Sequence, residues 1–78
     1  MFVLRQHEPD GAVVAEADTR FGIYRDSDGA RFANIDQDGT VEFGDHYRGR
    51  LDSGVVFSTG VDGNEKPVFF LDEVPDPA

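Results

Sequence analysis

The chain has 78 residues, a net charge of −9 and no cysteine, so it is a single small domain that no disulfide can stabilise. Its acidity disfavours direct binding to nucleic acid or to a membrane surface, because both are negatively charged. Residues 1–5 become charged too soon for a secretory signal and no apolar run approaches the ~18 residues of a membrane span, so we expect a cytoplasmic protein.

Asp-Gly pairs recur along the chain and predict tight turns between short antiparallel strands. The first turn, Pro-Asp-Gly at residues 9–11, joins two strands in an opening hairpin. This loop predicts that Val3 lies opposite Ala17 and that Leu4 lies opposite Glu16. Apolar and charged side chains do not separate cleanly in this register.

The second turn is predicted at residues 27–29, Ser-Asp-Gly, as a three-residue loop whose glycine takes a left-handed conformation. This loop predicts that Ile23 pairs with Ala33 and that Phe21 pairs with Ile35. It also places two arginines opposite each other at the end of the sheet, where water can screen them.

The third turn repeats this pattern at residues 37–39, Gln-Asp-Gly. A three-residue loop there pairs Asp36 with Thr40 and Ile35 with Val41, whereas a two-residue loop would scatter apolar groups over both faces. The two turns together predict one continuous apolar face. Its members are Phe21, Ile23, Ala33, Ile35, Val41 and Phe43.

The pattern is looser after these strands. Alternation predicts a strand at 47–51, and Asp-Ser-Gly at residues 52–54 predicts another three-residue turn that places Leu51 opposite Val55. The last strands are expected at 55–59 and 68–71.

The predicted fold is therefore all-β, a small antiparallel meander of six to eight short strands closed into a barrel or a two-sheet sandwich. Residues 1–73 form the single β domain. The proline-containing segment 74–78 is expected to be a frayed tail.

In the predicted register, Tyr24 and Phe32 pair across neighbouring strands on the face opposite the core. Asn34, Asp36 and Glu42 share that face. An outward aromatic pair ringed by acidic and polar groups is typical of the centre and rim of a protein interface. We therefore predict that these five residues bind a partner; the alternatives are burial in a second layer and a homodimer contact.

Residues 34–45 resemble the calcium loop of EF-hand proteins in the spacing of their oxygen-bearing side chains. The resemblance implies oxygen ligands from Asn34, Asp36, Asp38, Thr40, Glu42 and Asp45. A β-ladder through this segment and a calcium coil exclude each other, and the alternation of apolar residues favours the ladder. We therefore predict no metal site.

No convergent set of nucleophile, base and oxyanion donors is visible, so we expect neither an enzyme nor a cofactor. The predicted function is a non-enzymatic, acidic protein–protein interaction module that docks on a basic partner surface. In size and charge the chain resembles small acidic inhibitors of phage or host defence systems, which implies an inhibitor that mimics nucleic-acid charge. The alternatives are a structural or accessory domain with a salt-adapted acidic surface, and the calcium loop.

Overall fold

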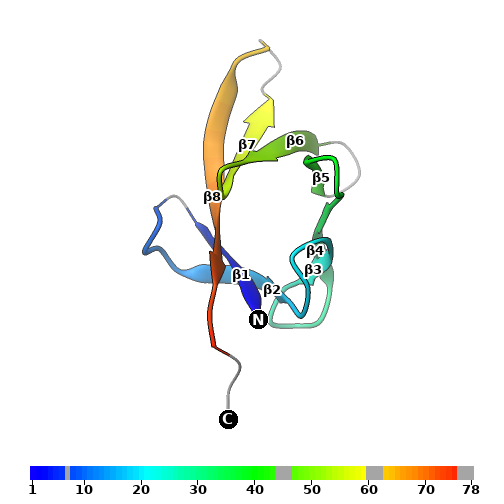
Figure 1. The fold of residues 1–78 in the computed structure, drawn as a ribbon, viewed down its shortest axis with the longest axis vertical. Coiled ribbons are helices and arrows are strands. Elements are labelled where there is room, and N and C mark those ends of the chain that lie inside the picture. Colours follow the sequence, from blue (N-terminus) through cyan, green and yellow to red (C-terminus); the bar gives the residue numbers. More distant parts are fainter. Residues whose placement is uncertain (7, 44–46, 60–62, 76–78) are drawn as a thin grey trace.

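The computed structural model describes residues 1–6, 8–43, 47–59 and 63–75, and the regular elements among them are β-strands. In chain order they are β1 Phe2–Gln6, β2 Val13–Ala17, β3 Gly22–Arg25, β4 Arg31–Ile35, β5 Thr40–Phe43, β6 Tyr47–Asp52, β7 Val55–Thr59 and β8 Glu65–Glu73. Each strand pairs antiparallel with the next, and β8 returns to pair with β1, so that the sheet closes (Figure 1). The predicted all-β meander is confirmed, and it is closed as a barrel.

The hairpin turns after β3 and β4 have the predicted three-residue loops. The Asp26 N–H donates to the Ala30 carbonyl oxygen at 2.9 Å, and the Gly29 N–H donates to the Asp26 carbonyl oxygen at 3.0 Å. The turn that begins at Asp36 repeats both bonds. Gly29 and Gly39 have φ angles of 82° and 91°, a left-handed conformation that glycine adopts without steric cost.

Three strand pairs contain a β-bulge, and the extra residue in each is apolar: Val14 in β2, Phe32 in β4 and Val68 in β8. All three side chains are half-buried and pack against the barrel core. A bulge bends its strand and increases the local twist. These bulges therefore add apolar side chains to the interior while curving the sheet toward closure.

The bulge at Phe32 reverses the predicted orientation of β3. Tyr24, rather than Ile23, pairs with Ala33. The loop itself was predicted correctly, but the extra residue shifts every β3 side chain to the opposite face. Phe21 and Ile23, predicted to lie in the core, are 37% and 47% exposed.

The opening hairpin also differs from the prediction by one residue. Leu4 pairs with Ala15 rather than with Glu16, and both apolar side chains face the interior. The connection is longer than predicted, since the Gln6 N–H donates to the Ala12 carbonyl oxygen at 2.9 Å, and this shifts the pairing by two residues. The bulge at Val14 then returns one of them, which leaves the difference of one residue at Leu4.

The turn between β6 and β7 has two residues instead of the predicted three. Ser53 and Gly54 have φ angles of 52° and 80°, the paired left-handed conformations of a type I′ turn. Leu51 consequently pairs with Val56 rather than with Val55.

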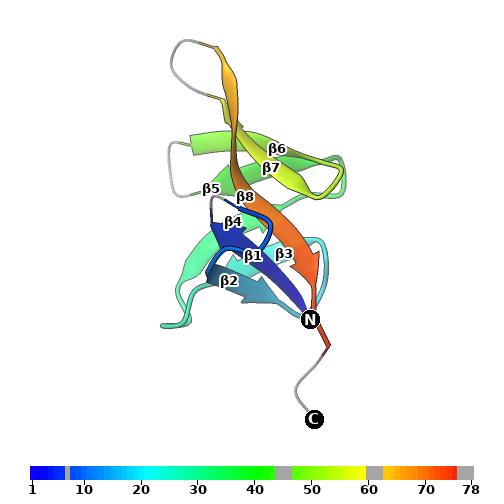
Figure 2. The ribbon, with the colours of Figure 1, turned by 90° about the vertical axis from the view of Figure 1, so that its left-hand side faces the viewer.

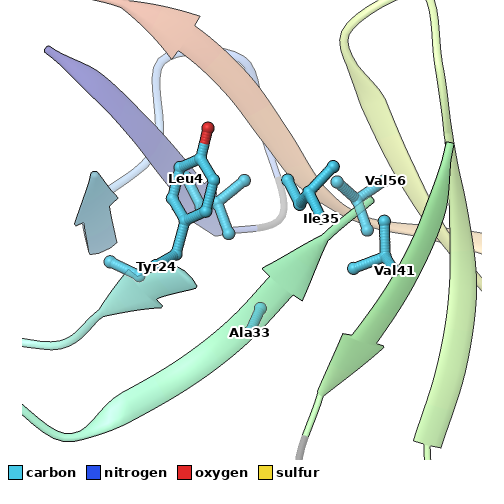
Figure 3. Packing of buried hydrophobic residues seen from close by; sticks show 7 residues of the cluster. Leu4, Tyr24, Ala33, Ile35, Val41 and Val56 are labelled. Carbon is cyan, nitrogen blue, oxygen red and sulfur yellow. The ribbon is translucent and has the colours of Figure 1, made fainter. Parts of the chain in front are cut away.

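Side chains from strands around the barrel fill its interior. The buried cluster comprises Leu4, Ala15, Tyr24, Ala33, Ile35, Val41 and Val56. Figure 3 shows the Tyr24 ring beside Leu4, with Ile35, Val41 and Val56 gathered at the other side of the group. The ring of Phe69 meets Phe32 and Phe43 edge-on, with centroids 5.2 and 5.9 Å apart.

The longest strand, β8, continues with β7 beyond the other strands as a projecting hairpin (Figure 2). At its other end Val74, the first residue of the predicted tail, is tied to the start of the chain. Its N–H donates to the Met1 carbonyl oxygen at 2.9 Å, and the Met1 ammonium donates to the Val74 carbonyl oxygen at 3.2 Å. Residues 76–78 of that tail lie outside the described residues.

Candidate interaction surface

The two aromatic residues of the predicted partner site point into the barrel. Tyr24 has 0% of its surface exposed, and its hydroxyl donates to the Arg20 carbonyl oxygen at 2.8 Å. Burial raises the pKa of Tyr24 to about 12, opposed by the smaller effect of the Arg20 charge. Phe32 packs edge-on against Phe69. The prediction of an outward aromatic pair is therefore wrong, because the bulge at Phe32 turns both rings inward.

The three polar residues of that predicted site lie together on the outside of the barrel. Asn34 pairs with Glu42 across β4 and β5, and its amide donates to the Asp36 carboxylate at 2.9 Å. Glu42 lies 3.6 Å from the Arg31 guanidinium. On its other side, Asn34 pairs with Ile23 of β3. An exposed isoleucine thus occupies the place where an aromatic side chain was predicted.

The barrel wall is least continuous between β2 and β3. Glu16 and Arg25 are the single residue pair between these two described strands, whereas the other neighbouring strands share between two and five pairs. We call this boundary the β2–β3 seam. The described connection from 18 to 21 closes one end of it, and the turn that begins at Asp26 lies at the other.

Two surface pockets lie along the seam, with volumes of about 450 Å³ and about 290 Å³. Glu16, Arg25, Asp26 and Ser27 line both of them. The larger pocket continues past Ile23, and the smaller one continues along Val13–Ala15. The seam is therefore a shallow groove on the outside of the barrel.

The large apolar side chains exposed on the described surface are Val13, Phe21 and Ile23, which are 48%, 37% and 47% exposed. Val13 lines the smaller pocket and Ile23 lines the larger one, whereas Phe21 lines neither. Val13 belongs to β2, Ile23 belongs to β3, and Phe21 immediately precedes β3. Exposed apolar side chains along a groove offer a surface from which a partner can exclude water.

The rim of the groove is acidic. Within the described part of the chain, Glu16, Asp18 and Asp26 take part in no ion pair. One oxygen of Asp26 accepts the N–H groups of Asp28 and Ala30, so it organises the turn as well as carrying charge. These carboxylates keep negative charge next to exposed apolar groups.

Three of the seven Lys and Arg side chains, those of Arg5, Arg31 and Arg50, are engaged by carboxylates of the described residues. Arg5 pairs with Asp72 at 3.2 Å, and the Arg50 guanidinium contacts both Asp52 and Glu65. Hydrogen bonds that the guanidinium donates to these two carboxylates raise the pKa of Arg50 above its usual value. Arg25, the arginine of the seam, donates to the Gly29 carbonyl oxygen at 2.9 Å. The groove thus carries one side-chain positive charge, that of Arg25, beside the negative charges of Glu16, Asp18 and Asp26, and its net side-chain charge is negative.

The described residues contain no cluster of three or more His, Cys, Asp or Glu side chains arranged to hold a metal ion. Residues 34–43 form a hairpin rather than the coil that the calcium alternative requires, and Asp45 of that alternative lies outside the described residues.

Comparison with protein-family models, with curated proteins and with solved structures finds no match for this chain. In the part of the chain that the structure describes, no helix has the length and apolar character of a membrane span.

Proposed function

We propose that this protein acts by binding, and that it docks the β2–β3 seam on a basic region of a partner protein. The observation that carries the proposal is the pair of pockets along the seam: exposed Ile23 lines the larger one with Glu16 and Asp18, and exposed Val13 lines the smaller one with Glu16. Exposed apolar side chains beside carboxylates that take part in no ion pair resemble the mixture of apolar and charged groups at protein interfaces.

Charge determines the class of partner. The net charge of −9 on 78 residues attracts basic surfaces over distances of about a Debye length and repels nucleic acid and further copies of the same chain. Rim carboxylates such as Glu16 and Asp18 then chiefly accelerate association and select the partner. The apolar side chains of the seam supply the contact that excludes water.

Asn34, Asp36 and Glu42, predicted from the sequence as partner-binding residues, continue the proposed surface beyond Ile23. Glu42 is already near Arg31, so its contribution to binding is smaller than that of a carboxylate without an ion pair. We therefore place the centre of the interface at the seam and treat these three residues as its edge.

The test is affinity capture with the folded chain as bait, followed by titration of the purified partner at low and high salt. The seam variant carries Ile23→Ser and Glu16→Gln, and the control variant carries Asp38→Asn together with Gln37→Ser at the β4–β5 turn. The control changes charge equally and is expected to keep its cap, because an asparagine oxygen can still accept the Thr40 N–H.

We expect the seam variant to bind at least about tenfold more weakly and the control to bind as the unmodified chain does. Affinity for the purified partner should fall with salt. Equal binding by both variants would contradict the seam as the docking surface. If the partner also binds nucleic acid, competition between that nucleic acid and this chain tests the inhibitory form of the proposal.

A further inference from the structure

One edge of β2 has almost no strand beside it. On its β1 side, β2 pairs through Val13, Ala15, Glu16 and Ala17, but on its β3 side it pairs through Glu16 alone. Main-chain N–H and C=O groups along a strand edge are a template for an added strand.

The turn after β3 explains why this edge is open. The strand ends at Arg25, and the Asp26 N–H bonds to the Ala30 carbonyl oxygen, which folds the chain back on itself. No described strand therefore continues the line of β3 beside Val13–Ala15. The pocket of about 290 Å³ occupies that position, between Val13–Ala15 and the turn residues Asp26 and Ser27.

We propose that an extended, basic segment of the partner protein adds as a short β-strand along Val13–Ala15. This inference rests on the proposed docking at the seam and specifies how the partner is held. Main-chain hydrogen bonds supply affinity in such strand addition, and alternate side chains supply selectivity. The bulge at Val14 bends β2, which limits the added strand to a few residues.

The residues around the edge determine the chemistry of the added strand. Exposed Val13 offers an apolar contact, while Glu16 and Asp26 offer two negative charges against the single positive charge of Arg25 in the same pocket. Successive side chains of a strand point to opposite sides, so the complementary segment alternates basic with apolar residues. Proline is excluded at positions that donate to β2. A second copy of the acidic chain is disfavoured by like-charge repulsion.

The test selects peptides of about seven residues from a random display library on the folded, immobilised chain. The best binder is then resynthesised in two forms, each methylated on alternate backbone nitrogens. One form loses the N–H groups that face β2, and the other loses those that face away, while charge and sequence stay the same.

We expect one methylated form to bind at least about tenfold more weakly and the other to bind within about threefold of the parent peptide. We also expect Glu16→Gln, but not Asp38→Asn, to weaken the parent peptide. Selection of no peptide, or equal binding by both methylated forms, overturns strand addition. Seam-dependent binding of the intact partner would then leave the proposed function standing, and its absence would remove that as well.

Discussion

The Tyr24 hydroxyl donates a hydrogen bond to the Arg20 carbonyl oxygen at 2.8 Å. This bond links the barrel interior to the 18–21 connection, which closes one end of the β2–β3 seam. Tyr24, which was predicted from the sequence to contact a partner, thus supports the candidate surface from inside the barrel. Its neighbour Ile23, predicted to lie in the core, forms part of that surface instead.

Removing the Tyr24 hydroxyl tests this support. Tyr24→Phe should lower the free energy of unfolding by about 1 kcal/mol, because it removes one hydrogen bond whose acceptor lies near solvent. Tyr24→Ala should cost about 3–5 kcal/mol through the cavity that it leaves in the core. Ile23→Ala is the matched control at the next position, and its cost should be within about 1 kcal/mol. Urea unfolding of the three variants measures these differences.

The ionisation of Tyr24 provides a second measurement. Burial raises its pKa from the ordinary 10.0 to about 12. The unfolded chain therefore releases this proton before the folded chain does, so the stabilising effect of a neutral Tyr24 is complete below pH 10.0 and is lost as pH rises toward about 12. Absorbance titration of the folded chain should show a late tyrosine component that Tyr24→Phe removes. If Tyr24→Phe removed a tyrosine component that titrates near the ordinary value instead, the burial of Tyr24 would be contradicted.

Gly49 is expected to tolerate no side chain. A Cβ at this position would overlap the Phe57 carbonyl oxygen and lie 3.1 Å from the Phe43 ring. Gly49→Ala should therefore destabilise the barrel by at least about 1–3 kcal/mol. Gly29→Ala is the comparison, because its Cβ would meet open space and only its φ of 82° opposes the change. We expect Gly29→Ala to lower the free energy of unfolding by about 1–2 kcal/mol. Thermal unfolding of both variants measures the effect of steric overlap at Gly49 and the effect of the left-handed backbone conformation at Gly29.

Amide hydrogen exchange should identify the open strand edge. Amides of Val13–Ala15 that do not bond to β1 lack a β3 partner, so they should exchange at least about a hundredfold faster than the paired amides of β4 and β5. Uniform protection along β2 would mean that the seam is closed in solution. The addition of a peptide that binds as a strand should slow these amides selectively.

The dependence of folding on salt concentration distinguishes the binding proposal from the alternative of a salt-adapted surface. If the acidity serves binding, the chain should be folded and unfold cooperatively in dilute buffer, with salt adding modest stability by screening its net charge of −9. A chain adapted to a salty cytoplasm should lose its structure at low salt and regain it in molar potassium chloride. Circular dichroism across a salt series measures the difference.

The turns were accessible from the sequence because their chemistry is local. Asp36 and Gly39 specify a three-residue loop whatever surrounds them, so the Ile35–Val41 pairing was predicted correctly. The loop at residues 27–29 was also correct, as was the Arg25–Arg31 pair that follows from it.

The orientation of β3 was not accessible in the same way. Whether Phe32 is an extra residue depends on its contact with Phe69, which lies far away in sequence. A periodic pattern cannot reveal that contact. The sequence contained one indication of the bulge: Phe32 and Ala33 are adjacent apolar residues, which breaks the strict alternation of apolar and polar residues along a strand. The seam was missed for the same reason, because Ile23 had been assigned to the core.

The most direct test of this account is a nuclear Overhauser spectrum of the folded chain, because the seam exists as described only if Tyr24 points inward and Ile23 outward. We expect cross-peaks from the Tyr24 ring to the methyl groups of Leu4, which lies beside it in the core (Figure 3). Cross-peaks from the Ile23 methyl groups to Leu4 and Ile35, with the Tyr24 ring contacting neither, would contradict it.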